Sequence, residues 1–213
     1  VPQPICGDDM RDCTKCGRPR LFFGISGGCM DSMVNKYTAN KRLRSEDAYT
    51  PDGRPDMRPD YPSTVYSQIL KKLFPDVPVV IGGIEASLRR LSHYDYWQDK
   101  VQKSILCDSG ADLLIYGMGE KPLADLVKNM KSLLTTEEPV LTSSKFRTII
   151  GSVPQTAYLC RATEWTSAED DLQLYSHEEC LADKKKQASN FRHIEEESNK
   201  YSASRITQAV GNK

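Results

Sequence analysis

The sequence predicts an α/β fold: a doubly wound, mostly parallel sheet of the Rossmann or flavodoxin type, with a charged helical arm at its C-terminal end. Residues 77–81 and 113–116 are continuous rather than alternating apolar runs, as strands covered on both faces require. Each run ends in glycine and leads into a helix-like stretch, which is the element order of a parallel sheet. Glycine allows close approach of a ligand, and ligands bind at the carboxyl ends of parallel strands. We therefore expect a binding crevice where these strands end.

Four strands are expected in this sheet: residues 20–26, 77–81, 111–116 and 147–153. Right-handed crossovers through helices at 63–74 and 122–134 would cover its two faces. Ser63, directly after Pro62, fits the N-cap of the first of these helices. Minor elements are also expected, namely a helix at 85–91, a short strand within 103–108 and a weaker strand at 157–161.

A long polar segment, residues 31–61, separates the first two strands. A segment of this length without apolar periodicity is uncommon inside a compact domain, and is either disordered or functional. Its aromatic and guanidinium groups suit polar recognition, and we single out Tyr37, Arg42, Arg44 and Tyr49. The alternative is a solvated surface excursion that binds nothing.

The candidate binding residues lie at the predicted strand ends, which we call the glycine edge. Helix starts near Glu85 and Pro122 would point amide N–H groups at this edge and favour an anionic ligand. Glu85 could equally be a helix-start residue stabilised by the helix dipole. The position of segment 31–61 tests this predicted site. A segment ordered across the glycine edge would support it, and a segment packed on the opposite edge of the sheet would contradict it. Besides the four residues of the segment, the set is Gly27, Gly28, Gly82, Gly83, Glu85, Arg89, Arg90, Gly117, Gly119 and Glu120.

A polar and aromatic cluster follows the expected 85–91 helix and offers an enzymatic alternative. His93 and Asp95 are weak candidates for a general acid and base, with Arg89 and Arg90 nearby for phosphate chemistry. A surface histidine beside packed aromatic residues is at least as good an interpretation. Neither a dinucleotide G-x-G-x-x-G fingerprint nor a phosphate-binding G-x4-G-K-[ST] loop occurs in the sequence.

The composition of the chain limits the classes of partner that can be argued from the sequence. With 29 basic and 29 acidic side chains the formal net charge is zero, which gives no case for nucleic acid or an anionic membrane. No apolar run approaches the roughly 18–20 residues of a membrane span. The first residues lack the features of a signal peptide, and we expect a cytoplasmic protein. The chain begins with Val1 just before an early strand, and we expect it to be a piece of a longer protein.

The seven cysteines assign no metal site. Cys13 and Cys16 form the only close pair, with Cys6 upstream, whereas a zinc site usually needs two such pairs. A redox pair is the other alternative for them, and their role stays open. The remaining cysteines are expected to be small hydrophobic residues in a reducing compartment.

The composition changes near Thr166, after which the chain is highly charged and helix-permissive. We predict one long helix that crosses or leaves the α/β body as a linker or docking arm. Its narrow apolar stripe would consist of Leu181, Ala188, Phe191 and Ile194. The predicted organisation is an N-terminal segment (1–19), an α/β domain (20–165) and the arm (166–213).

Residues 21–61, 77–97 and 110–126 resemble the N-terminal region of the YgiQ-type radical SAM proteins, a bacterial family of poorly defined function. The resemblance covers roughly residues 20–200. It implies a longer parent protein with a radical SAM barrel, whose C-x3-C-x2-C motif holds a 4Fe-4S cluster that reductively cleaves S-adenosylmethionine. That motif is absent from this sequence, so no residue here is assigned to the cluster.

The two strand–glycine motifs also look like the cobalamin-binding domains that precede many radical SAM barrels and have a flavodoxin-like sheet. The D-x-H-x-x-G motif that supplies their lower cobalt ligand is absent, so cobalamin binding lacks that support. The leading hypothesis is an N-terminal module that positions a small-molecule or macromolecular substrate, or a cofactor, over the barrel of the same parent chain, without chemistry of its own. The alternatives are a free-standing binding or hydrolytic domain using His93 and Asp95, and a protein-interaction module acting through the arm.

Overall fold

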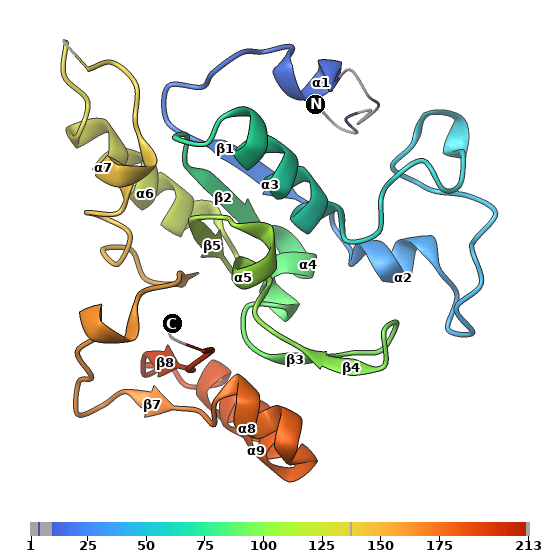
Figure 1. The fold of residues 1–213 in the computed structure, drawn as a ribbon, viewed down its shortest axis with the longest axis vertical. Helices are drawn as coiled ribbons and strands as arrows, with labels where there is room; N and C mark the ends of the chain where they lie inside the picture. Colours follow the sequence, from blue (N-terminus) through green and yellow to red (C-terminus); the bar gives the residue numbers. More distant parts are fainter. Residues whose placement is uncertain (1–3, 5–9, 137, 212–213) are drawn as a thin grey trace. The chain divides into compact units, whose positions relative to one another are not determined.

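The fold is described from a computed structural model, which covers residues 4, 10–136 and 138–211 (Figure 1). The chain divides into two compact units. Unit 1 contains residues 1–90 and 105–158, and unit 2 contains residues 91–104 and 159–213. Each unit is described by itself, and the predicted boundary between 165 and 166 stays a prediction.

Unit 1 carries the main sheet and the helices around it. Its strands are β1 (Phe23–Ser26), β2 (Val79–Gly82), β5 (Leu113–Ile115) and β6 (Thr156–Ala157). Its helices are α1 (Arg11–Thr14), α2 (Ser32–Lys36), α3 (Pro62–Leu73), α4 (Gly83–Leu88), α5 (Ile105–Ser109), α6 (Glu120–Ser132) and α7 (Ser143–Phe146), with a 3-10 turn at Pro51–Gly53.

The sheet has the order β1-β2-β5-β6. β1, β2 and β5 are parallel, with Ile25 opposite Ile81 and Ile81 opposite Leu114. The mixed α/β architecture with a mostly parallel sheet is therefore confirmed, whereas the finer Rossmann or flavodoxin class stays a prediction. The last strand, β6, pairs antiparallel with β5 through Leu114 and Ala157.

Two predicted strands, at residues 147–153 and within residues 103–108, are wrong. Residues 147–153 form turns after α7, and the apolar pattern there arises because Phe146 and Val153 are buried in the core. The weaker candidate at 157–161 overlaps the real edge strand, β6. The short strand expected within 103–108 is largely replaced by α5, a case in which a short apolar run does not distinguish strand from helix.

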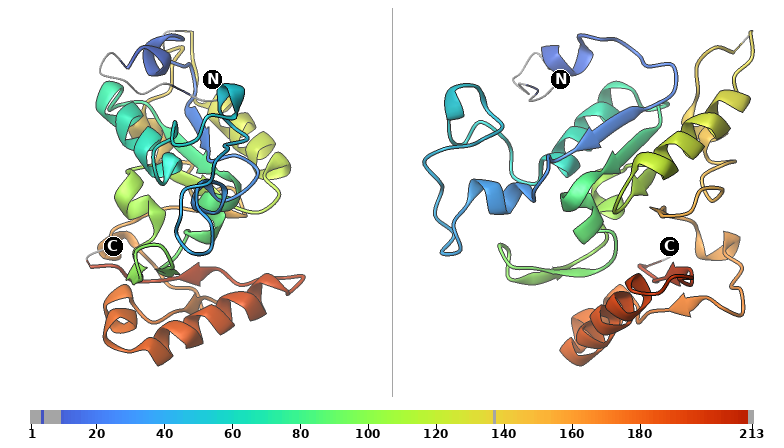
Figure 2. Two further views of the ribbon diagram at one scale, coloured as in Figure 1. Left: turned by 90° about the vertical axis from the view of Figure 1, so that its right-hand side faces the viewer. Right: turned by 180° about the vertical axis from the view of Figure 1, so that it is seen from behind.

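Both predicted helices are present, as α3 and α6, and they flank the sheet on opposite sides (Figure 2). α3 connects the parallel strands β1 and β2, whereas the strand after α6 is the antiparallel β6, so α6 is not the predicted crossover between parallel strands. α6 buries Leu126 and Met130 in the core. The helix expected at 85–91 begins two residues earlier, as α4. Ser63 is not the N-cap of α3, because Tyr61 occupies that position and Pro62 begins the helix. The shared core consists of Val80, Leu113, Ile115, Leu126, Met130, Leu141, Phe146 and Val153.

Unit 2 contains short strands and two helices rather than one long helix. Its elements are β3 (His93–Asp95), β4 (Lys100–Gln102), a 3-10 turn at Ala162–Glu164, β7 (Leu172–Gln173), α8 (His177–Ala182), α9 (Lys184–Ser198) and β8 (Ile206–Thr207). β3 and β4 form an antiparallel hairpin, and β7 pairs parallel with β8.

The single helix predicted after Thr166 is interrupted at Asp183, whose extended backbone ends α8 and whose side chain caps α9 by accepting from the Lys185 N–H. The predicted apolar stripe is also not the buried side. Leu181 and Phe191 are 57% and 62% exposed, whereas the buried residues of α9 are polar. Among the helices that the structure describes, none is long and apolar enough to cross a membrane.

Candidate functional site

The glycine edge forms at the carboxyl end of the sheet, because β1, β2 and β5 are parallel neighbours. Two glycines there are in unusually close contact with other groups. A Cβ on Gly27 would lie 2.8 Å from Oε2 of Glu85. Gly28 has φ +104°, and its Cβ would lie 2.7 Å from the ring of Tyr49. The close approach that Gly27 and Gly28 permit at the end of β1 is thus made by the side chains of Glu85 and Tyr49.

The remaining edge glycines lie where the sequence predicts them. Gly82 ends β2 and Gly83 begins α4 with φ +82°. Gly117 follows β5, and Gly119 is the N-cap of α6. Glu120, the first residue of α6, is exposed at a helix start where the dipole favours its charge.

Glu85 is fully buried and ties the two ends of segment 31–61 together. One carboxylate oxygen accepts from the Ser32 N–H at 3.1 Å, and the other accepts from the Ser63 N–H at 3.0 Å. These amides lie in the first turns of α2 and α3, whose unsatisfied N–H groups stabilise a buried negative charge. The carboxylate is therefore engaged by protein groups, in a role that neither sequence interpretation foresaw.

Asp47 organises the centre of the segment. Its carboxylate accepts from Asn35 Nδ2 at 2.8 Å, from the Tyr49 N–H at 2.9 Å and from Arg58 Nε at 3.0 Å. Burial alone would raise the pKa of Asp47, but the bonds from Tyr49 and Asn35 and the charge of Arg58 hold that pKa below its ordinary value. Asp47 thus remains ionised although it is buried.

Arg58 joins this network to the sheet. Its Nη1 donates to the Gly27 carbonyl at 3.1 Å, and its guanidinium lies 4.6 Å from the centre of the Tyr49 ring. Arg58 and Tyr49 therefore anchor segment 31–61 at the β1 end of the glycine edge. From this end of the sheet the segment projects outward (Figure 1). These contacts reach Gly27 and Gly28 only, so both the predicted course of the segment across the whole edge and ligand binding there stay predictions.

Tyr49 also contacts Cys29, the residue that follows the glycine pair. The Cys29 N–H donates to the Tyr49 hydroxyl at 2.9 Å, and Cys29 Sγ lies 2.7 Å from the same oxygen. The hydrogen bond with the thiol raises the pKa of Tyr49, and burial adds to the effect. No local sequence pattern signals this pair, because the two residues are twenty positions apart.

A second polar cluster orders the far part of the segment. Lys36 forms ion pairs with Asp56 at 2.8 Å and Asp60 at 2.9 Å, and donates to the Arg58 carbonyl at 2.9 Å. Burial works to lower the pKa of Lys36, but the bonds to Asp56 and Asp60 raise it overall. The Tyr37 hydroxyl donates to Asp60 at 3.0 Å, and burial followed by this carboxylate raises the pKa of Tyr37.

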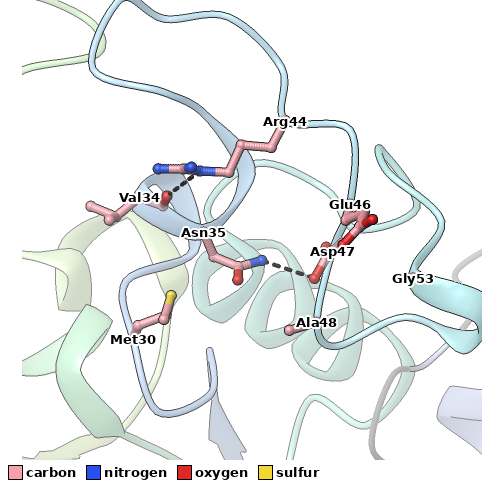
Figure 3. Close-up of a pocket in the computed structure, with 8 residues that line it drawn as sticks. All are labelled: Met30, Val34, Asn35, Arg44, Glu46, Asp47, Ala48 and Gly53. Carbon is pink, nitrogen blue, oxygen red and sulfur yellow. Dashed lines mark hydrogen bonds between the residues drawn. The ribbon is translucent and has the colours of Figure 1, made fainter.

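The two predicted arginines of the segment differ in their surroundings. Arg42 is exposed. Arg44 donates through Nε to the carbonyls of Val34 and Tyr37, at the end of α2. It also borders a hollow of about 460 Å³ between α2 and residues 44–53 (Figure 3). The lining residues are Met30, Val34, Asn35, Arg44, Glu46, Asp47, Ala48 and Gly53.

Arg89 and Arg90 are held by protein groups at the end of α4. Arg89 forms an ion pair with Asp31, at the start of the segment, and lies over the Tyr61 ring. Arg90 lies 5.0 Å from the centre of the Tyr116 ring. Both arginines thus connect α4 to the surrounding loops, and their predicted role in phosphate chemistry stays a prediction.

His93 and Asp95 lie in unit 2, on the β3–β4 hairpin. The His93 ring Nδ1 is 3.0 Å from the Leu91 carbonyl. Asp95 is buried and accepts from the Gln98 N–H at 2.9 Å, an arrangement that stabilises the turn of the hairpin. Their proposed acid and base roles stay predictions.

The described residues do not fit an iron–sulfur cluster. Within residues 4, 10–136 and 138–211, no group of three or more His, Cys, Asp or Glu side chains is arranged to hold a metal ion. Cys13 lies in α1, Cys16 lies two residues after the end of this helix, and Cys6 lies outside the described residues. A 4Fe-4S cluster is held by cysteine thiolates brought close together, and the cysteines among the described residues are not grouped in this way.

Comparison with known proteins gives a consistent result along the whole chain. A family described as "Radical SAM N-terminal" matches residues 1–213. A UPF0313 protein of Bacteroides thetaiotaomicron is 79% identical over all of this chain, which covers 34% of that protein. A UPF0313 protein of Porphyromonas gingivalis is 62% identical over 99% of this chain and 32% of its own length. A UPF0313 protein of Geobacter sulfurreducens is 43% identical over the whole chain and 33% of its length.

No solved structure matches this chain. The chain spans about a third of the length of the curated relatives that it matches. Because the family match covers every residue, the chain belongs to the radical SAM N-terminal family.

Proposed function

We propose that this chain is a substrate- or cofactor-positioning module of a radical SAM enzyme, and that the chemistry takes place in another part of the longer protein. The observation that carries this proposal is the family match over residues 1–213, in a chain whose described cysteines do not fit a cluster. The relatives are about three times as long, so most of each relative lies beyond the matched region. In this proposal the radical SAM barrel of the same polypeptide holds the 4Fe-4S cluster and cleaves S-adenosylmethionine.

The glycine edge and the ordered segment 31–61 support a positioning role. Asp47, Arg58 and Glu85 hold the segment through buried, charge-assisted hydrogen bonds, from which we infer that the surface beside the edge is rigid. A rigid surface is suited to holding a reactant at a defined place. The hollow beside Arg44 and Met30 is the candidate contact region for a polar substrate (Figure 3).

Cofactor content tests this proposal. The full-length protein, reconstituted with iron and sulfide, is expected to carry a 4Fe-4S cluster and to release 5′-deoxyadenosine from S-adenosylmethionine when reduced. This chain expressed alone is expected to take up no cluster, and the full-length Cys13→Ser/Cys16→Ser protein is expected to keep its iron. Stoichiometric cluster uptake by the chain alone, or loss of iron in the double variant, would contradict the proposal.

The same assay distinguishes the positioning proposal from the hydrolytic alternative that uses His93 and Asp95. His93→Ala removes the candidate base but leaves the backbone of the hairpin intact. The positioning proposal expects unchanged iron content and unchanged S-adenosylmethionine cleavage in this variant. An alternative in which residues 166–213 act as an interaction arm requires that their deletion weakens association with the barrel.

A further inference from the structure

Four large apolar side chains are exposed around α4, at the glycine edge. Met30 is 42% exposed, Ile84 49%, Leu88 63% and Met118 77%. Single exposed apolar residues are ordinary on a protein surface, but a gathered set marks an interaction site. Methionine is also enriched at interfaces, because its flexible thioether adapts to a partner.

Two of these residues lie on the exposed side of α4 itself. Ile84 and Leu88 are four residues apart and lie on the same side of the helix, whereas Glu85 and Ala86 between them are fully buried. α4 continues directly from β2 and lies beyond the ends of the strands (Figure 1). The exposed side of α4 therefore faces away from the sheet at its carboxyl end.

The loop after β1, which carries Met30, passes beside the start of α4, and the loop after β5, which carries Met118, passes beside its end. The Gly117 N–H donates to Ser87 Oγ at 3.3 Å, which fixes Met118 beside the end of the helix. The Gly28 carbonyl lies 3.4 Å from the position of a Cβ on Gly83, at the helix start, and Met30 follows two residues later. We call Met30, Ile84, Leu88 and Met118 the α4 surface.

We propose that the α4 surface docks against the catalytic domain of the same polypeptide. This inference rests on the proposed function, and adds the face through which the module acts. The relatives carry roughly two thirds of their length beyond the region matched here, and that remaining part of the polypeptide is the partner we propose. The surface adjoins the glycine edge, and docking there brings any ligand held at that edge to the partner.

Site-specific photo-crosslinking in the full-length protein tests the contact. Met118 is replaced by p-benzoylphenylalanine, and the captured peptide is identified by mass spectrometry. Met57, which is 52% exposed on segment 31–61, is replaced in the same way as the control. We expect Met118→p-benzoylphenylalanine to capture peptides of the catalytic domain and the Met57 variant to capture none.

A second substitution checks that the surface itself is responsible. Adding Leu88→Glu to the Met118 variant is expected to reduce capture by about tenfold or more, because a carboxylate is costly at an apolar contact. Any one of three results would overturn the docking proposal. These are capture of residues 159–213 by the Met118 variant, its capture of a second, isotope-labelled copy, and capture by it that is no greater than that of the Met57 control. Those outcomes leave the cofactor assay unaffected, whereas cluster uptake by this chain alone would overturn the proposed function even if the cross-link forms.

Discussion

The Arg58 guanidinium and the Asp47 carboxylate form a buried ion pair, 3.0 Å apart, in which each side chain is only 4% exposed. The pair joins two parts of segment 31–61, and Arg58 extends the link to the Gly27 carbonyl at the glycine edge. Removing one partner of a buried ion pair is strongly destabilising, because the remaining charge is then buried without a counter-charge. The order of the segment consequently depends on both residues together.

Arg58→Met is expected to destabilise the segment by about 3–5 kcal/mol, because it leaves the Asp47 carboxylate buried without its cation. Amide hydrogen exchange of residues 31–61 in the full-length protein measures the effect. Lys121→Ala, which removes a pair with Asp125 on the exposed side of α6, is the control and should cost less than about 0.5 kcal/mol. Arg58→Met/Asp47→Asn should recover part of the loss. Unchanged exchange in Arg58→Met would show that the pair does not order the segment.

Lowering the pH is expected to destabilise segment 31–61, because Asp47 then becomes protonated. Its pKa in the folded chain lies below the ordinary 3.8, so the unfolded chain binds the proton more readily. The corresponding stabilisation is complete well above pH 3.8 and is lost as the pH falls through the lower, folded pKa. Thermal unfolding measured between about pH 5 and pH 3 should show this decline. The Asp47→Asn protein should start from lower stability and decline less steeply, and a parallel decline would exclude Asp47 as the cause.

The periodic elements could be predicted from the sequence, but the polar network could not. The apolar runs at β2 and β5 predict two parallel strands, and the spacing at α3 and α6 predicts two helices, and these elements are confirmed. Segment 31–61 lacks such a period, and its structure depends on pairings between distant positions. Arg58 and Asp47 are eleven residues apart, and nothing local distinguishes them from the exposed Arg42.

Gly28→Ala is expected to be more disruptive than an ordinary glycine substitution. A left-handed backbone costs a non-glycine residue about 1–2 kcal/mol, and the new Cβ would also lie 2.7 Å from the Tyr49 ring. Gly53→Ala is the matched control, since Gly53 has φ +64° but no atom within 4 Å of the added Cβ. Exchange of the Tyr49 region should increase clearly more in Gly28→Ala than in Gly53→Ala. Equal effects in the two variants would mean that the contact between Gly28 and Tyr49 does not contribute.

Glu85→Gln tests whether one buried carboxylate holds both ends of segment 31–61. The carboxylate accepts from the Ser32 and Ser63 N–H groups, whereas glutamine keeps one acceptor oxygen and places an NH2 donor opposite the other amide. Losing one hydrogen bond to a charged group costs about 1.5–3 kcal/mol. Exchange at one or both of these amides should therefore rise by at least about tenfold in Glu85→Gln.

The control is Glu120→Gln, in which the exposed first residue of α6 loses its charge with an effect below about 1 kcal/mol. Gly27→Ala provides an independent check, because its Cβ would lie 2.8 Å from Glu85 Oε2 and displace the carboxylate without removing it. Both Glu85→Gln and Gly27→Ala should therefore raise exchange at Ser32 and Ser63. If neither amide responds in either variant, the segment is held by the Asp47 network alone and Glu85 has only a local packing role.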